Sequence, residues 1–337
     1  MDLSSAREAK IEFRQELDNG ISVASAGPGG PTPAASVAVG IALRPGRRFA
    51  LALRPQDPAG PGAQVIADWV DRLGDDVDVR VIGVVRKQSI PWHRQRIRPI
   101  EPGASVSHVD VTAGTIGTFV RRPTVAAPGA VELLSNNHVL ADENEAELGD
   151  QILQPGAFDG GTVADDVIGR LAAFTPIDPD GVNLVDCALS SIDDEVGWSL
   201  GTFDDDGGLT GLFDLDDETD ETEIPPVAKH GRTTGRTTGT ITAIELDNLR
   251  VQYDAGVVRF DDQIEVQGTG GPFSQGGDSG SLVLTAGGGA RAVGLLFAGS
   301  ETGGPGGGGL TYLNPIAVVL NSLDAELVLS AAEQRAP

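Results

Sequence analysis

A serine with glycines close on both sides, in the run Gly277-Asp278-Ser279-Gly280, is the first feature of this sequence that points to chemistry. Glycine lets the backbone turn sharply and leaves room for a substrate carbonyl beside the Ser279 hydroxyl. An apolar strand is predicted to follow at residues 282–284. A serine hydroxyl becomes a nucleophile only next to a general base, and the base needs a third group to orient it. The rest of the sequence must therefore supply both.

The chain has four histidines, and His138 is the candidate for the base. It stands where an apolar strand gives way to a polar turn, which exposes the imidazole while the flanking backbone stays anchored. His93, in a basic segment bounded by prolines, and His230, one residue before a glycine, are interpreted as surface or structural histidines. His108 precedes an alternating strand and has no other mark of chemistry.

Asp186 is the candidate for the orienting carboxylate, because it interrupts the apolar run 182–189. An unpaired carboxylate in such a run would be costly to bury, so Asp186 should have a partner. The alternative interpretation is a surface aspartate on an edge strand. If His138 is the partner, a hydroxyl, an imidazole and a carboxylate would lie in a row.

The order and separations of His138, Asp186 and Ser279 resemble those of trypsin-like serine peptidases with the chymotrypsin fold. Residues 135–139, Ser-Asn-Asn-His-Val, resemble the histidine block of the bacterial HtrA-like members, and residues 186–189 resemble the family's aspartate block. Residues 134–141 and 149–156 are also similar to an intracellular branch that includes the plant narrow-leaf protein. The resemblance covers about residues 103–325.

This resemblance implies a serine endopeptidase that hydrolyses peptide bonds through an acyl-enzyme. Ser279 would be the nucleophile, His138 the base, and Asp186 the group that holds the imidazole in the right tautomer. The backbone N–H groups of Gly277 and Ser279 would form the oxyanion hole.

The resemblance also implies an internal cation that pairs with Asp278, next to the nucleophile, and fixes the oxyanion loop without proteolytic activation. We expect this cation to be Arg232, in the Arg-Thr-Thr-Gly turn that opens the second barrel. The alternative is an exposed arginine in a glycine turn.

The substrate pocket is visible only through the resemblance. It implies that Phe273, six residues before Ser279, lies at the base of the pocket and that Gly299 forms part of its wall. An apolar floor disfavours Lys and Arg, so the pattern predicts small to medium apolar side chains before the cut. The chain departs from the family at Ser281, where glycine is usual, and at Phe297, where a serine often supports the aspartate.

The composition restricts the partners and the compartment. A net charge of −25 repels nucleic acid and anionic membranes, so the expected partner is a protein or peptide substrate, with no nucleic acid and no membrane. The single cysteine, Cys187, excludes an intramolecular disulfide and fits a reducing compartment. Residues 1–10 are charged and no run of 18 apolar residues occurs, so we expect a cytoplasmic protein.

No cofactor or metal is expected from the sequence. The acidic segment 204–223 is interpreted as a solvated loop, since it lacks the ligand spacing of an EF-hand; calcium binding is the alternative. The basic segment 86–98 is interpreted as a linker that pairs with the acidic body, and a phosphate site is the alternative.

Glycine turns and runs of Val, Ile, Leu and Thr predict a mainly β protein. Residues 1–98 are predicted to form a small α+β domain, with helices at 5–18 and 62–73 and strands at 37–43, 49–53 and 77–85. Residues 99–337 are predicted to form two six-stranded antiparallel β-barrels, the chymotrypsin fold, closed by a helix after Asn314-Pro315. The α+β domain would serve packing or homo-oligomer contact, and gating of the protease cleft is a hypothesis.

The competing function is a binding or scaffold protein that keeps the protease fold without turnover. Self-cleavage alone and non-proteolytic acyl transfer are further alternatives. The presence of all three catalytic residue types favours the enzyme.

Overall fold

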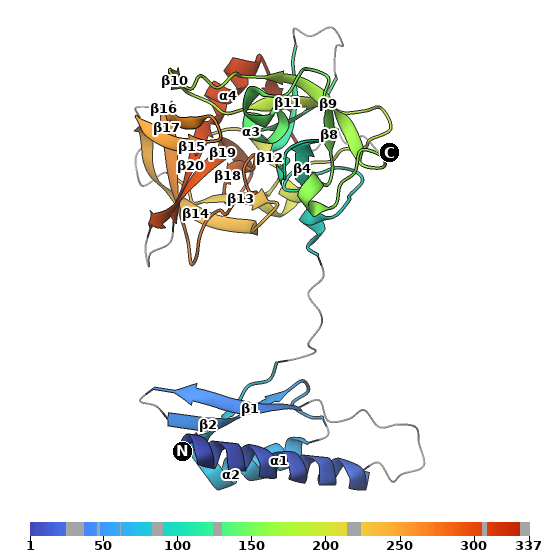
Figure 1. Ribbon diagram of the computed structural model, residues 1–337, viewed down its shortest axis with the longest axis vertical. Helices are drawn as coiled ribbons and strands as arrows, with labels where there is room; N and C mark the ends of the chain where they lie inside the picture. The colour runs from blue at the N-terminus through green and yellow to red at the C-terminus, as the bar shows by residue number, and fades with distance from the viewer. Residues whose placement is uncertain are drawn as a thin grey trace. The chain divides into compact units, whose positions relative to one another are not determined.

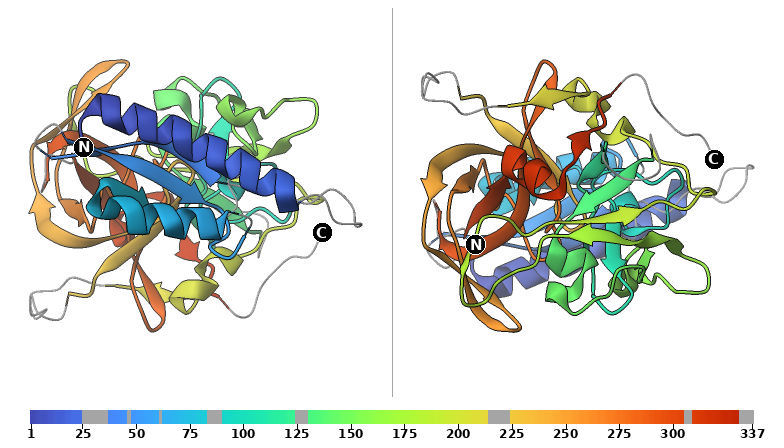
Figure 2. Two further views of the ribbon diagram at one scale, coloured as in Figure 1. Left: turned by 90° about the horizontal axis from the view of Figure 1, so that it is seen from below. Right: turned by 90° about the horizontal axis from the view of Figure 1, so that it is seen from above.

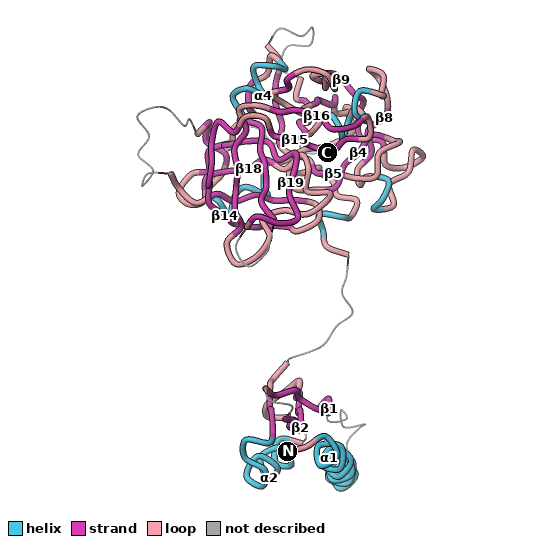
Figure 3. Tube along the Cα trace, turned by 60° about the vertical axis from the view of Figure 1, so that its left-hand side comes forward, coloured by secondary structure: helices cyan, strands magenta, loops and turns pink. Residues whose placement is uncertain are grey.

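The structure, a computed structural model, describes residues 1–24, 37–45, 48–60, 62–82, 90–123, 130–213, 224–304 and 309–330. The chain divides into two compact units, Met1–Ser89 and Ile90–Pro337. The boundary therefore lies between residues 89 and 90, whereas the sequence predicts it between residues 98 and 99. Helices and strands share the first unit, whereas strands dominate the second (Figures 1 and 3). No helix in the described ranges is both long and apolar enough to cross a bilayer.

The first unit packs two helices against a sheet of three strands in its described residues. The helices α1 (Leu3–Ala24) and α2 (Ala63–Leu73) lie side by side over the strands (Figure 2, left). The strand order is β1-β2-β3, with bounds Val37–Arg44, Arg48–Pro55 and Val77–Val79. Phe13 of α1 meets the edge of Trp69 of α2, with 5.5 Å between ring centroids, in a core that includes Leu51 and Leu53 of β2. The predicted small α+β domain is confirmed.

Six strands of the second unit close into a β-barrel, counted over the part of the chain that the structure describes. Their order is β19-β18-β13-β14-β17-β20, and β20 pairs again with β19. The interior is filled by Val227, Val266, Val283 and Leu313. The barrel strands, with β12 attached at the edge, are β12 (Leu209–Leu212), β13 (Val227–Gly231), β14 (Gly235–Leu246), β17 (Gln263–Gly268), β18 (Leu282–Thr285), β19 (Ala290–Gly303) and β20 (Gly309–Pro315).

The other large sheet of this unit is a half-barrel, although the sequence predicts a second closed barrel. A strand that follows the C-terminal helix α4 (Ile316–Leu323) pairs with the edge of β6, with Leu327 opposite Val120. The predicted mainly β class with a C-terminal helix is confirmed. In sheet order, the strands are β21 (Glu326–Leu327), β6 (Thr118–Arg121), β7 (Glu132–Ser135), β11 (Ala188–Ser191), β9 (Val167–Phe174), β8 (Gln151–Leu153), β4 (Ser105–His108) and β5 (Gly114–Thr115).

A small third sheet of this unit is built from strands that fall within the chain ranges of the two large sheets. It contains β10 (Val182–Asn183), β15 (Leu249–Tyr253) and β16 (Gly256–Phe260), in the order β10-β16-β15. The strands β15 and β16 form an antiparallel hairpin, and β10 runs parallel to β16.

The charged segments differ from the predictions in part. The acidic segment begins with the 3-10 helix η5 (Gly201–Asp206), in which Asp206 is buried and pairs with His230 and Arg236, so this part is not a solvated loop. Residues 214–223 lie outside the described residues. In the basic segment, Arg96 pairs with Asp166 at 3.0 Å, as expected of a segment that binds the acidic body; residues 86 and 87 lie outside the described residues.

Candidate active site

His138 and Asp186 lie in direct contact. The short helix α3 (Asn137–Leu140) begins just after β7, so His138 stands on a helix rather than on the predicted turn. Its Nδ1 lies 2.5 Å from Oδ2 of Asp186, and its backbone N–H donates to Oδ1 at 3.2 Å. Asp186 is fully buried, so it is not a surface residue of an edge strand, and the imidazole is the partner that a buried carboxylate requires.

The contact shifts the two pKa values in opposite directions, and each shift favours the charged form of its group. Burial raises the pKa of Asp186, but the charge and hydrogen bond of His138, together with the Tyr253 hydroxyl, outweigh it and hold that pKa below its usual value. Burial lowers the pKa of His138, yet the Asp186 carboxylate outweighs this effect and raises it above the ordinary imidazole value. The pair is therefore suited to hold an imidazolium when a proton arrives.

Buried side chains fix the backbone around Asp186. Asn314 accepts the Asp186 N–H at 2.9 Å and donates to Gln263 at 2.7 Å. Asn136 donates to the Asp186 carbonyl oxygen at 2.7 Å. Sequence reasoning missed Asn314, for which the only signal is a polar residue just before the final helix.

Ser279 lies, half-buried, in the loop that leads into β18. Thr115 of β5 holds this loop through two hydrogen bonds. Its N–H donates to the carbonyl oxygen of Ser279 at 2.8 Å, and its hydroxyl donates to the carbonyl oxygen of Gly277 at 2.9 Å. Among the described residues, no acceptor receives the N–H of Gly277 or of Ser279. An oxyanion hole requires N–H groups that the protein leaves without an acceptor, and the role of these two stays a prediction.

Ser279 and His138 open onto adjoining hollows of about 520 Å³ each. Ser279 and Ser274 line one, and His138, Glu143 and Tyr253 line the other. No hydrogen bond joins these two described side chains, Ser279 and His138, directly; contacts of this kind often tighten only when a substrate binds. The hollows share one wall, which contains Gly299 and its neighbours Phe297, Ala298 and Ser300.

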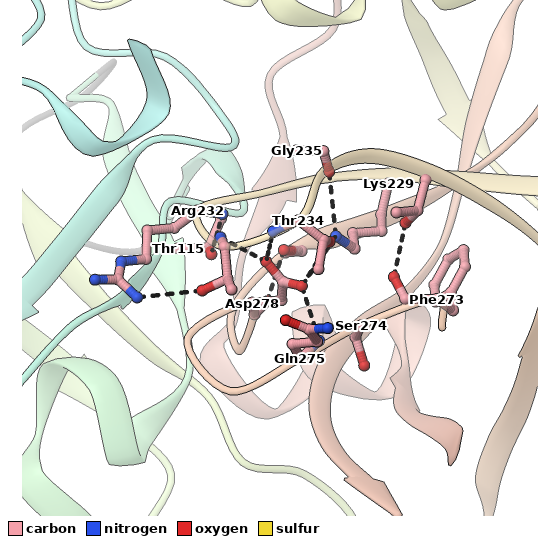
Figure 4. A network of polar contacts seen from close by, with 12 residues as sticks. Thr115, Lys229, Arg232, Thr234, Gly235, Phe273, Ser274, Gln275 and Asp278 are labelled. Atoms are coloured by element: carbon pink, nitrogen blue, oxygen red, sulfur yellow. Dashed lines mark hydrogen bonds and ion pairs between the residues drawn. The ribbon is translucent and has the colours of Figure 1, made fainter. Parts of the chain in front are cut away.

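Asp278 is held by Lys229 and not by Arg232, which corrects the prediction (Figure 4). Lys229 Nζ lies 3.2 Å from Asp278 Oδ2, and both side chains are fully buried. Lys229 points into the barrel because it lies two residues after Val227 in β13, and residues two apart in a strand share a face, here the inner one. Gly231, the next residue on that face, leaves space for the carboxylate, since a Cβ there would overlap Asp278 Oδ1. Burial lowers the pKa of Lys229, an effect that the Asp278 charge only partly offsets.

The remaining hydrogen bonds of Asp278 fix the loop before Ser279. Its Oδ1 accepts the N–H groups of Thr233 and Thr234, at 2.8 and 3.1 Å. Its Oδ2 accepts the Thr234 hydroxyl at 2.7 Å and the Gln275 N–H at 3.0 Å (Figure 4). A buried carboxylate with this many donors has little freedom, so the adjacent peptide groups are held in place.

Arg232 turns to the opposite side from the inner face of β13. Its guanidinium forms a two-point contact with Asp159 of the 3-10 helix η4 (Ala157–Asp159), at 2.6 and 2.7 Å. It still touches the oxyanion loop, because a Cβ on Gly277 would lie 2.7 Å from Arg232 Nη1. Arg232 supports the loop through packing and is neither exposed nor paired with Asp278.

Phe273 does not form the floor of the substrate pocket, so the position that the family resemblance implies for it is wrong. Its ring is buried in the barrel core with Val266 and lies so close to Gly239 that a Cβ there would be 2.9 Å from it. A large aromatic ring gains most by filling the barrel interior. The next residue, Ser274, lines the hollow instead, and its hydroxyl lies 2.7 Å from that of Thr311.

No protein-family model matches the chain, and no curated protein matches its sequence. Among solved structures, Thermobifida fusca Protease A is similar over 68% of this chain and 99% of its own, with a TM-score of 0.45 and 19% identity. Cellulomonas bogoriensis chymotrypsin covers 68% and 100%, with a TM-score of 0.43 and 19% identity. A glutamic acid specific serine protease covers the same shares, with a TM-score of 0.44 and 18% identity. These structural neighbours are chymotrypsin-fold serine proteases, at identities that do not identify which residues act.

Proposed function

We propose that the second unit is a serine endopeptidase. The observation that carries this proposal is the buried Asp186 in contact with His138, at a hollow that shares a wall with the hollow of Ser279. The free N–H groups of Gly277 and Ser279 supply the second requirement, a site for negative charge on the substrate oxygen.

In the proposed reaction, Ser279 Oγ forms a bond to the peptide carbonyl carbon while its proton passes to Nε2 of His138. The carbonyl oxygen becomes an oxyanion that accepts hydrogen bonds from the N–H groups of Gly277 and Ser279. As the C–N bond breaks, the imidazolium returns the proton to the leaving amine, which leaves an acyl-enzyme on Ser279. Water then repeats the sequence with His138 as its base and releases the acid.

The proposed substrates are proteins or peptides with an uncharged side chain before the cut. Ser274 and Gly299, which line the hollow beside Ser279, carry no charge, and the one charged residue among those described in its lining, Glu301, is exposed to solvent. Cys187 is buried and free, which agrees with a reducing, cytoplasmic compartment. The HtrA-like and narrow-leaf-like relationships stay predictions.

The test is hydrolysis of an unfolded protein substrate by the full chain. We expect new amino groups to appear with the wild type, and none above background with Ser279→Ala, because no other residue replaces the nucleophile. Ser191→Ala, which changes a hydroxyl that accepts the Arg170 N–H of the neighbouring strand β9 at 3.1 Å and lines neither hollow, serves as the control and should keep full activity. Equal cleavage by Ser279→Ala would contradict the proposal, and a wild type without turnover would support the scaffold alternative.

Gly277→Ala is expected to lower kcat by about 100-fold or more, the usual effect of losing one oxyanion donor. Gly277 has a φ of +91°, which disfavours any side chain, and a Cβ would lie 2.7 Å from both Arg232 Nη1 and Thr233 Oγ1. The control is Gly149→Ala, which has a similar φ of +100° but no heavy atom within 4 Å of the added carbon. Comparable kcat values for the two variants would show that Gly277 does not shape the oxyanion hole.

A further inference from the structure

Tyr253, which sequence reasoning did not single out, contacts the proposed catalytic pair from a third element. Its hydroxyl donates to Oδ2 of Asp186 at 2.6 Å, the same oxygen that Nδ1 of His138 contacts. The bond is buried, and the Tyr253 ring lies edge-on to the imidazole with 6.1 Å between centroids. The phenol thus completes the set of donors around the carboxylate.

The hairpin that carries Tyr253 is tied to both partners of this pair. On one side, β16 pairs with β10, and Phe260 lies opposite Asn183. Asn183 precedes Asp186 by three residues. On the other side, the Asp254 N–H in the hairpin turn donates to Glu143 at 2.8 Å, shortly after α3. The position of the phenol is therefore set by the two segments that it serves.

The segment that carries Glu143 holds an uncommon backbone conformation. Asp142, Glu143 and Asn144 have φ values of 47°, 55° and 81°, although none of them is glycine. Asn144 is fixed by side-chain hydrogen bonds to Asn137 and to the backbone of Ile177, which offset the backbone cost. Strained backbone of this kind gathers at functional sites, here beside His138 and against the turn of the hairpin.

Phe297 explains why a donor is needed from this direction. It stands where the family resemblance expects a serine that supports the aspartate, and a phenyl ring cannot donate a hydrogen bond. Phe297 instead packs on Phe260 at 4.8 Å, and Phe260 stacks on Tyr253 at 5.9 Å. The residue that removes the expected hydroxyl is thus part of the packing that holds the phenol on Asp186.

We propose that Tyr253 is a positioning residue that orients Asp186 and adjusts how strongly its carboxylate binds the imidazolium of His138. Its kinetic effect rests on the proposed peptidase function, whereas the contact itself does not. A phenol that donates to Oδ2 withdraws charge from the oxygen that holds the imidazole, so the carboxylate binds imidazolium less tightly than it would alone.

Other charged groups near this pair set the background of any pH profile. Glu143 faces His138 and Tyr253 and raises the pKa of both groups. Cys187, next to Asp186, stays a thiol because burial raises its pKa to about 11. Arg250 lines the hollow that contains His138. None of these is altered by replacing the phenol with phenyl, so a shift in that variant reports on the Tyr253–Asp186 bond.

The kinetic test compares Tyr253→Phe with Tyr312→Phe, which changes the only other tyrosine of the chain, in the same hollow but without a bond to Asp186. We expect Tyr253→Phe to lower kcat/KM about tenfold, the usual effect of losing a hydrogen bond to a charged group. We also expect the acid limb of its pH profile to move to higher pH, because the freed carboxylate raises the pKa of His138. Tyr312→Phe should leave the acid limb where it is in the wild type, because it removes no hydrogen bond to Asp186. An unmoved acid limb, with or without lost activity, would overturn the proposal.

A second test needs no enzymatic activity. In Tyr312→Phe, Tyr253 is the single tyrosine, so absorbance of the phenolate reports on it alone. Burial and the Asp186 charge raise the pKa of Tyr253 well above the ordinary value, so no phenolate should form where exposed tyrosine titrates. Adding Asp186→Asn should bring the transition to lower pH. A titration that Asp186→Asn leaves unchanged would overturn the contact, whatever the outcome for the peptidase function.

Discussion

Asp186→Asn is expected to lower kcat about 10⁴-fold and leave the fold intact, if the peptidase mechanism holds. The Asp186 carboxylate accepts from Nδ1 of His138, which leaves the lone pair on Nε2 for the proton of Ser279. An asparagine amide can donate to Nδ1 instead and move the ring proton to Nε2, so the base is lost. The measurement is kcat on one peptide substrate, with thermal unfolding of both proteins to show that the fold survives.

The chain offers a matched control for this variant. His108 and Asp150 form a second His–Asp pair, 3.2 Å apart, outside the hollows at Ser279. Asp150→Asn makes the same chemical change and should leave kcat within about twofold, since surface substitutions have small effects. Equal losses in the two variants would show that Asp186 has no special role.

Lys229→Met is expected to reduce the free energy of unfolding by about 3–5 kcal/mol, because it leaves the Asp278 carboxylate buried without its cation. The substitution fills a similar volume, and both wild-type side chains are fully buried. We expect activity to fall as well, since the loop that carries Ser279 loses its anchor. Chemical denaturation gives the stability, and turnover at a temperature where the variant is folded gives the activity.

A double-mutant cycle separates Lys229 from Arg232 as the partner of Asp278. Combining Lys229→Met with Asp278→Asn should show a coupling free energy of about 1–3 kcal/mol, as for groups in direct contact. The same cycle with Arg232→Met should give a much smaller coupling, because the Arg232 guanidinium pairs with Asp159. A larger coupling for Arg232 would show that Arg232, and not Lys229, is the partner of Asp278.

The contact between His138 and Asp186 was predictable because it depends on local blocks whose residue types have few other uses. A carboxylate inside the apolar run 182–189 needs a partner, and a histidine at the end of an apolar strand is the natural choice. The glycines around Ser279 likewise have a local explanation, since Gly277 and Gly280 both have positive φ. The predicted strands and helices follow from alternation and helical spacing for the same reason.

The partner of Asp278 could not be derived from the turn motif alone. Lys229 lies in β13, whereas Arg232 lies in the turn that follows it, and only the alternation of β13 places Lys229 on the inner face, toward Asp278. Val227, two residues before Lys229, is the signal for that register, because an apolar residue at the start of a barrel strand marks the inner face. Phe273 was misplaced for a related reason: position relative to Ser279 predicts a pocket, while ring size favours the core.

The Tyr253–Asp186 bond and the pairing of β21 with the half-barrel sheet depend on contacts between distant segments. Tyr253 lies 67 residues from Asp186, and nothing in the alternating run 249–253 marks its phenol as a partner of a buried acid. The edge of β6 is covered by β21, a two-residue strand too short to give a pattern in the sequence. Long-range pairing of this kind needs the folded chain.

Covalent labelling by a fluorophosphonate tests the central claim most directly. If His138 activates Ser279 while Asp186 orients it, the intact protein gains one phosphonyl group, and peptide mapping finds it on Ser279. Labelling should disappear in Ser279→Ala and fall steeply in His138→Ala. A folded wild-type protein that takes up no label, or carries it on another residue, would mean that the three side chains do not work together.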